Sequence, residues 1–303
     1  MNPILVKAPS TTANMGPGFD CLGMALDLWN EITVIPLDNP AEGARVAVTG
    51  EGSGELPTDE NNLVYKSMEF LFKEASLEIP LFKLLCNNQI PLKRGLGSSA
   101  AAIAGGLVAA NAMCDDVFSK QELLEMAATI EGHPDNVAAA LLGGLQLVVS
   151  DGPQIYTASI PVPDNIQAVI FVPEFTIATD DARRVLPDSV SRQDAIFNMG
   201  RLALLISGMA SNHPEYLSVA TEDKIHQPYR QTLFPAMKLI FNAARAASAL
   251  GVFLSGSGPT ILALANEREM TIAYEMFDAA RQADIEGKVD IVGTAVSGAY
   301  IDK

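Results

Sequence analysis

One short segment combines glycines, hydroxyl side chains and alanines in a way that could bind phosphate. Residues 91–101 read PLKRGLGSSAA, with Gly95 and Gly97 before Ser98 and Ser99 at the predicted start of a helix. Glycines let several backbone N–H groups point at one anion, the helix N-terminus adds partial positive charge, and the hydroxyls can donate to phosphate oxygens. The segment matches neither GxxxxGK[ST] nor GxGxxG, and alone it also suits an ordinary turn and helix cap.

A second group of polar side chains lies in residues 131–136, which read EGHPDN within an Ala- and Leu-rich stretch. Glu131, His133, Asp135 and Asn136 bring carboxylate, imidazole and amide groups together. Such a group is typical of a binding or catalytic site. The alternative is a solvent-exposed helix cap, because Asp and Asn also favour helix starts.

Two further glycine-rich turns carry polar residues. Residues 14–20 read NMGPGFD, which places Asn14 and Asp20 around a Gly-Pro-Gly turn, and residues 255–260 read SGSGPT between two apolar stretches. Each turn alone predicts no more than a tight hairpin. These turns indicate a site only if the fold places their polar residues beside the two segments described above.

The elements that must position these residues follow from periodicity and turn signals. Strands are predicted near residues 4–10, 31–35, 45–49, 81–86 and 145–150, and helices over about 99–113 and 120–131, with a short helix after Pro134. Ser119 and Glu122 form a capping box at the start of the second helix, and Gly132 ends it. The first 90 residues therefore look rich in strands.

The second half alternates strands and helices differently. Strands are predicted near residues 154–160, 168–172, 252–254 and 261–265, with helices near 194–211 and 234–249 and a last helix and strand towards the end. Asp151, Gly152 and Pro153 make a domain joint. The sequence thus predicts an α+β protein of two domains, 1–152 and 153–303, with a ligand-binding cleft between them.

Composition limits the class of function. The 303 residues are 49% hydrophobic, enough to bury the cores of two domains. The net charge of −16 argues against binding to nucleic acid or anionic membranes, which require a basic surface. ATP stays compatible with this charge, because backbone N–H groups and Mg²⁺ act locally.

The sequence also predicts a cytoplasmic protein. The first residues, MNPILVKAPS, lack the basic and apolar pattern of a signal or transit peptide, and the weakly polar stretches 100–113 and 137–149 are too short to span a membrane. Cys21, Cys86 and Cys114 are widely spaced with no histidine at metal-ligand spacing. This pattern indicates reduced thiols rather than disulfides or a zinc site.

Taken together and in this order, four segments resemble the GHMP family of small-molecule kinases over almost the whole chain. They read STTANMGPGFDCLGMAL, PLKRGLGSSAAAIAGG, EGHPDNVAAALLGG and LSGSGPTILAL, and are most similar to the homoserine kinase branch rather than to the mevalonate or galactose branches. The resemblance implies an N-terminal domain like ribosomal protein S5 domain 2 and a ferredoxin-like C-terminal domain.

For the nucleotide, the resemblance implies that the glycine-rich segment holds the phosphates of ATP, with Ser98 and Glu131 as ligands of Mg²⁺. Glu125 is the alternative metal ligand, and Asn62 is expected near the adenine. The expected ATP-binding residues of the segment are Pro91, Leu92, Lys93, Arg94, Gly95, Leu96, Gly97, Ser98, Ser99, Ala100 and Ala101.

For the acceptor, the resemblance implies a pocket formed by both domains. Its expected residues are Asn14, Asp20, His133, Asn136, Thr179, Arg183, Arg230 and Gly256, of which Asn136, Thr179 and Arg183 serve catalysis. Thr179 and Arg183 share a face if their segment is helical, and Pro228 to Arg230 form a helix-breaking turn. Without the motifs, Arg183, Arg184 and Arg230 would suit ordinary solvated charge.

These expectations describe an ATP- and Mg²⁺-dependent kinase that phosphorylates the side-chain hydroxyl of L-homoserine. An amide cannot accept the hydroxyl proton, so we expect no general base from the protein, with Asn136 orienting the hydroxyl and Asp135 pointing elsewhere. The alternatives are a GHMP kinase with another alcohol, such as a mevalonate-type kinase, a non-catalytic nucleotide-binding regulator, and a structural α/β protein. An exposed apolar edge would suit a homodimer.

Overall fold

A seven-stranded sheet forms the N-terminal part of the protein. The computed structural model describes residues 3–37, 45–152 and 154–302. The strands run in the order β11-β1-β2-β4-β3, and β5 pairs with β2 and with β6. Their bounds are β1 Ile4–Asn14, β2 Gly18–Pro36, β3 Arg45–Gly50, β4 Phe82–Asn88, β5 Leu145–Asp151, β6 Gln154–Ile160 and β11 Tyr300–Asp302.

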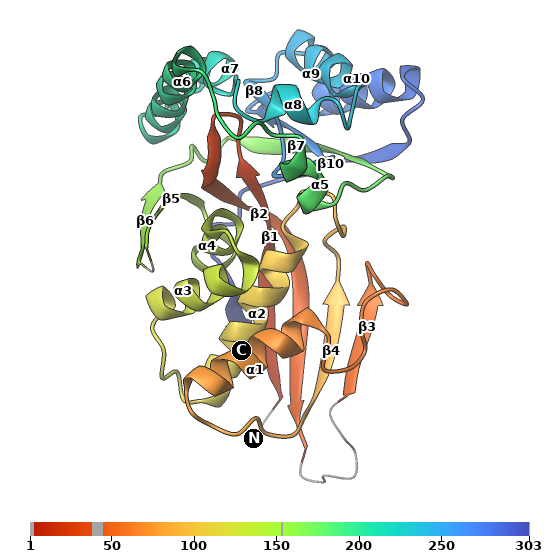
Figure 1. The fold of residues 1–303 in the computed structure, drawn as a ribbon. Helices are drawn as coiled ribbons and strands as arrows, with labels where there is room; N and C mark the ends of the chain where they lie inside the picture. The colour runs from red at the N-terminus through yellow and green to blue at the C-terminus, as the bar shows by residue number, and fades with distance from the viewer. Residues whose placement is uncertain (1–2, 38–44, 153, 303) are drawn as a thin grey trace.

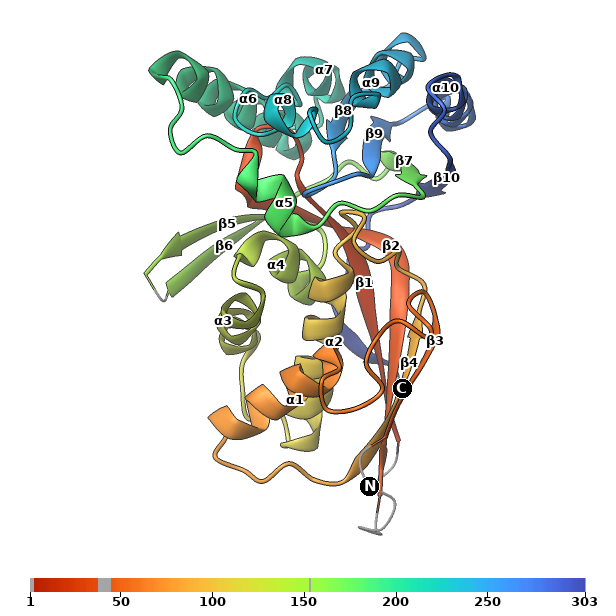
Figure 2. The ribbon, with the colours of Figure 1, turned by 45° about the vertical axis from the view of Figure 1, so that its right-hand side comes forward.

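Four helices cover one face of this sheet (Figures 1 and 2). They are α1 Leu63–Glu74, α2 Ser98–Met113, α3 Lys120–Glu131 and α4 Pro134–Leu142. The capping box predicted for α3 is present, because Ser119 and Glu122 each accept a hydrogen bond from the other's backbone N–H. Helix α1 was not predicted, because the strand signals on either side of it dominated the first 90 residues.

The C-terminal part is ferredoxin-like, as predicted. Its four-stranded sheet has the order β10-β7-β9-β8, which is the β-α-β-β-α-β arrangement with α9 and α10 on one face. The strands are β7 Gln167–Pro173, β8 Gly251–Leu254, β9 Ile261–Ala265 and β10 Gly287–Val292. The helices are α5 Thr179–Arg184, α6 Arg192–Ala210, α7 Leu217–Ala220, α8 Gln227–Arg230, α9 Met237–Ala246 and α10 Glu269–Gln282, with a 3₁₀ helix at Pro214–Tyr216.

The expected domain joint lies in a hairpin turn. Strands β5 and β6 pair antiparallel from Leu145↔Ile160 to Asp151↔Gln154, so β6 belongs to the first sheet. Pro153, within this joint, lies outside the described residues, as do the first two residues of the chain. The chain passes to the second sheet between β6 and β7 and returns at its end, where β11 pairs with β1.

The second sheet is buried on both faces, and this joins the two parts of the protein. Side chains alternate along a strand. Val169 and Phe171 of β7 pack against α9 and α10, whereas Ala168, Ile170 and Val172 belong to the same buried cluster as the core of the first sheet. Among the described residues, none of the helices is both long and apolar enough to cross a bilayer.

Helix α2 lies in the middle of this shared core. Its buried residues include Ala100, Ala101, Ile103, Ala104, Gly105, Gly106 and Leu107. A helix that is largely apolar on all sides and rich in small residues is expected where neighbouring backbones come close on several sides. At Gly106 a side chain has no room, because a Cβ there would lie 2.7 Å from the Val64 carbonyl oxygen of α1.

Replacing Gly106 should therefore separate α1 from α2. We expect Gly106→Ala to lower the free energy of unfolding by about 1–3 kcal/mol through overpacking. Gly200→Ala in α6 is the matched control, because nothing lies within 4 Å of its Cβ position, and the better helix propensity of Ala should stabilise it by about 0.5–1 kcal/mol. Urea unfolding of both variants measures the difference; equal effects would contradict the close approach.

Candidate active site

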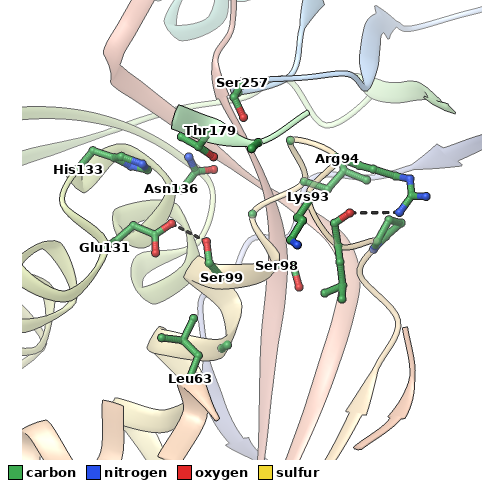
Figure 3. Close-up of a pocket in the computed structure, with 18 of the residues that line it drawn as sticks. Leu63, Lys93, Arg94, Ser98, Ser99, Glu131, His133, Asn136, Thr179 and Ser257 are labelled. Atoms are coloured by element: carbon green, nitrogen blue, oxygen red, sulfur yellow. Dashed lines mark hydrogen bonds between the residues drawn. The ribbon is translucent and has the colours of Figure 1, made fainter. Parts of the chain in front are cut away.

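The predicted site residues meet in one cavity between the two sheets. The cavity has a volume of about 400 Å³ and is lined from β1, the start of α2, the α3–α4 junction, α5, α8 and the β8–β9 turn. Figure 3 shows the labelled side chains around it. Every residue predicted for the site lines this cavity except Ala100 and Ala101, which are fully buried in the core.

The glycine-rich segment forms a loop that ends at the N-terminus of α2. Gly97 is the residue before the helix, with φ of 67°, and no side chain caps the first helical N–H groups. These groups can therefore bind an anion, which the helix dipole also favours. A Cβ at Gly97 would collide with Thr11 Oγ1. Glycine is thus required here by the packing of β1 as well as by its backbone angles.

Glu131 and Ser99 face each other beside this helix start. Ser99 Oγ donates to Glu131 Oε1 at 2.5 Å, as Figure 3 shows. Burial raises the pKa of Glu131, and the hydrogen bond from Ser99 partly opposes that shift. Glu125, the other expected metal ligand, accepts from Gln121 Nε2 at 3.0 Å and does not line the cavity.

The geometry suits a magnesium ion that is shared with phosphate oxygens. Among the described residues, no group of three or more His, Cys, Asp or Glu side chains could hold a metal by itself. Mg²⁺ is commonly held by one or two protein oxygens together with substrate phosphates. Ser98, Ser99 and Glu131 all line the cavity, and a half-buried carboxylate whose charged form is disfavoured gains stability from a cation.

Asp20 and Arg183 form an ion pair across the cavity. Arg183 lies on α5, and its Nη1 and Nη2 donate to Asp20 Oδ2 and Oδ1 at 3.0 and 2.8 Å. The hydrogen bonds to Asp20 raise the pKa of Arg183. Asn14 supports the pair, because its Oδ1 accepts from the Asp20 N–H at 3.0 Å. Both residues were predicted in the site, but their pairing was not.

Arg230 brings a second guanidinium to the same end of the cavity. Its side chain is buried, with Nε donating to the Ala182 carbonyl at 3.2 Å and Nη1 to the Gly256 carbonyl at 2.8 Å. Burial, together with the charge of Arg183, lowers its pKa to about 10. The turn predicted around Arg230 is wrong, because Gln227–Arg230 form α8 with Pro228 in the first helical turn, where proline is tolerated.

Asp135 holds the two polar residues that flank it. His133 Nδ1 lies 3.2 Å from Asp135 Oδ1, and this hydrogen bond raises the pKa of His133. Asp135 also accepts from the backbone N–H of Asn136 at 2.8 Å. Asn136 Oδ1 in turn accepts from Thr11 Oγ1 at 2.8 Å. The amide nitrogen of Asn136 lies 3.5 Å from Asp135 Oδ1, which leaves one of its two N–H groups for a ligand.

Asn62 and several residues that the sequence did not indicate complete the lining of the cavity. Asn62, predicted near the adenine, is the N-cap of α1: its Oδ1 accepts from the Val64 N–H and its Nδ2 donates to the Pro57 carbonyl. Lining residues that the sequence did not indicate are Asn30, Leu56, Leu63, Val64, Cys86, Asn88, Ala102, Ala178 and Ser257. Asp135, which was expected to point elsewhere, also lines the cavity. The helical spacing of apolar residues after Asn62 could have revealed α1 and with it Leu63 and Val64.

Two family models match separate parts of the chain. The model of the GHMP kinases N terminal domain matches residues 62–144, and that of the GHMP kinases C terminal domain matches residues 194–283. The first match includes the loop before α2 and the α3–α4 junction, which both contribute to the cavity.

Proteins that match the chain over most of its length are named homoserine kinase. One from Synechocystis sp. is 42% identical over 98% of each chain, and one from Caldanaerobacter subterraneus subsp. tengcongensis is 45% identical over 87% of this chain and 83% of its own. The crystal structure of homoserine kinase from Cytophaga hutchinsonii has a TM-score of 0.91 and 32% identity, covering 100% of this chain and 98% of its own.

The fold extends to more distant proteins. The crystal structure of L. major mevalonate kinase has a TM-score of 0.71 and 14% identity over 96% of both chains, a likeness in fold alone. The family models, by contrast, match this sequence in both halves, and relatives share 42–45% of its residues over most of its length. The chain therefore belongs to the GHMP kinase family.

Proposed function

We propose that this protein transfers the γ-phosphoryl group of ATP to the side-chain hydroxyl of L-homoserine, forming O-phospho-L-homoserine. The observation that carries the proposal is a cavity lined both by the uncapped N-terminus of α2 and by Asp20, Arg183 and Arg230. The full-length relatives named homoserine kinase support the same reaction. The product is a phosphorylated amino acid of the threonine biosynthetic route.

The loop before α2 is the proposed phosphate site. Its backbone N–H groups, together with the hydroxyls of Ser98 and Ser99, would hold the triphosphate, and Lys93 at the cavity can add positive charge. Ser98 and Glu131 are the proposed ligands of Mg²⁺. When bound there, the ion would neutralise charge on the transferred phosphoryl group.

The acceptor would bind between the charged groups of the two domains. Homoserine carries an ammonium and a carboxylate on one carbon, so Asp20 can accept the ammonium while Arg183 and Arg230 bind the carboxylate. Thr179, on the same helix as Arg183, lines the cavity with its hydroxyl available for the acceptor. Asn14, His133 and Gly256 complete this side of the pocket.

Phosphoryl transfer depends mainly on positioning and charge stabilisation. Asn136 would orient the attacking hydroxyl through Nδ2, because its Oδ1 is already bonded to Thr11. An amide accepts no proton at neutral pH, and Oδ1 of Asp135 is bonded to His133 and to the Asn136 N–H. We therefore propose that the proton leaves with the phosphate or to solvent, and that Arg183 stabilises the developing charge.

A panel of acceptors tests the proposed function. Coupled measurement of ADP release should show turnover with L-homoserine and only background with mevalonate, shikimate, galactose or no acceptor. Turnover with another alcohol alone would identify a different GHMP kinase. A nucleotide-induced thermal shift without ADP release for any alcohol would instead identify a regulator.

Removing the Glu131 charge should lower catalysis without lowering stability. The pKa of Glu131 is higher in the folded protein than in the unfolded chain. The folded protein therefore loses stability as the pH rises from the unfolded pKa through the folded pKa, because Glu131 then ionises in a less favourable environment. Glu131→Gln should thus be at least as stable as the parent at neutral pH without Mg²⁺. Its kcat should fall about ten- to a hundred-fold, as expected for a residue that acts on the metal.

Glu125→Gln is the control for this variant, because Glu125 lies on the same helix but outside the cavity. It should keep its kcat and its dependence on Mg²⁺, which a titration of activity against the ion measures. The assignment of Glu131 fails if Glu131→Gln keeps full turnover, or if Glu125→Gln alone loses the Mg²⁺ dependence.

Asp20 should decide between acceptors that differ only in the ammonium group. We expect strong preference for L-homoserine over 4-hydroxybutyrate, because the ammonium group would add a charge-assisted hydrogen bond to Asp20 that 4-hydroxybutyrate cannot make. Asp20→Asn should remove most of that preference and leave nucleotide affinity intact. Asp181 is exposed and paired with Arg184 on its own helix, so Asp181→Asn should change neither the preference nor the nucleotide affinity. The ratio of kcat/KM for the two acids measures the preference.

A further inference from the structure

Arg94 lies in the phosphate-binding loop, but its side chain contacts the C-terminal domain. Its Nε donates to the Pro173 carbonyl at 2.8 Å and its Nη2 to the Glu174 carbonyl at 2.6 Å. Its Nη1 donates to the Leu92 carbonyl in its own loop at 3.1 Å. In Figure 3 the guanidinium lies on the opposite side of the loop from Glu131. All three guanidinium nitrogens are thus bonded to backbone carbonyls.

The two carbonyls belong to the segment that carries the proposed acceptor residues. Strand β7 ends at Pro173, and residues 174–178 lead directly to α5, which begins with Thr179 and includes Arg183. This connection has no helix or strand of its own. Its path depends on the contacts at each end. At the first end Arg94 bonds to the carbonyls of Pro173 and Glu174, and the Glu174 N–H donates to the Glu286 carbonyl at 2.9 Å. At the other end Arg183 pairs with Asp20.

Other backbone contacts join the same parts of the chain. The Ile177 N–H donates to the Lys93 carbonyl at 3.4 Å, and the Thr260 N–H donates to the Arg94 carbonyl at 3.2 Å. Ser255 Oγ donates to the Gly95 carbonyl at 2.5 Å. The carbonyl groups of Lys93, Arg94 and Gly95 are therefore bonded to the C-terminal domain, which leaves the N–H groups of the loop for phosphate.

We propose that Arg94 is a positioning residue that holds segment 174–184 against the phosphate-binding loop and so couples the binding of acceptor and nucleotide. A planar guanidinium reaches successive carbonyls because its donors point in fixed directions, whereas lysine offers one compact charge. Acceptor binding at α5 and phosphate binding at the loop then favour the same arrangement of the segment. The identity of the acceptor rests on the proposed function.

Replacing Arg94 with lysine separates this role from that of a simple positive charge. Arg94→Lys keeps the charge but loses the planar fork. Arg184→Lys is the matched control, because Arg184 is exposed and pairs with Asp181 on its own helix. Hydrogen exchange of residues 174–184, measured without any ligand, should be about five-fold faster or more in Arg94→Lys and unchanged in Arg184→Lys.

Calorimetry then measures the coupling. In the parent protein ADP should bind about five-fold more tightly or better with saturating L-homoserine than without it. In Arg94→Lys, L-homoserine should no longer enhance ADP binding, and kcat/KM for homoserine should fall about ten-fold or more. The Kd for ADP alone should change less than about three-fold. A merely structural role would lower Tm without removing the enhancement.

Several results would overturn the inference. Unchanged exchange in residues 174–184 of Arg94→Lys would remove the positioning role, and a retained enhancement of ADP binding would remove the coupling. Loss of ADP affinity in Arg94→Gln but not in Arg94→Lys would make Arg94 a phosphate ligand instead. A parent protein that does not phosphorylate homoserine would reject the proposed function, and the exchange measurement would still decide the role of Arg94.

Discussion

The packing of α2 inside the core determines where the rest of the site can be. This helix is surrounded by the first sheet and by its neighbouring helices, and its buried alanines and glycines allow their close approach. Such a helix cannot shift without opening the core. Its uncapped N-terminus is therefore a fixed group of donors, which is the kind of preorganisation that stabilises developing charge with little rearrangement.

An acidic protein can bind anions at this site because its positive groups are concentrated locally. The net charge is −16, yet Arg183 and Arg230 both line the cavity. The centre of the Phe19 ring lies 5.7 Å from the guanidinium carbon of Arg183 and 5.4 Å from that of Arg230. Neutral His226 accepts from Arg230 and is stacked on the same ring, with burial lowering its pKa to about 4. Its neutrality avoids a third charge beside two arginines.

Local patterns predicted the parts of the fold that depend on nearby residues. The capping box of α3, the start of α2 and the turn between β8 and β9 each follow from a few adjacent side chains. The pairing of Asp20 with Arg183 joins residues 163 positions apart, and β6 enters the first sheet through partners that its own sequence does not specify. The direction of the Arg94 side chain likewise depends on where β7 ends, which no local pattern reveals.

The return of the chain to its first sheet affects how the protein is made. Strand β11 pairs with β1, and Lys7 lies 2.8 Å from Asp302 across that junction. A ribosome synthesises β1 first and β11 only after the whole ferredoxin-like domain. During that interval the outer side of β1 has free N–H and C=O groups, the kind of edge that attracts other chains. The nascent protein is thus more exposed to misassociation than the finished one.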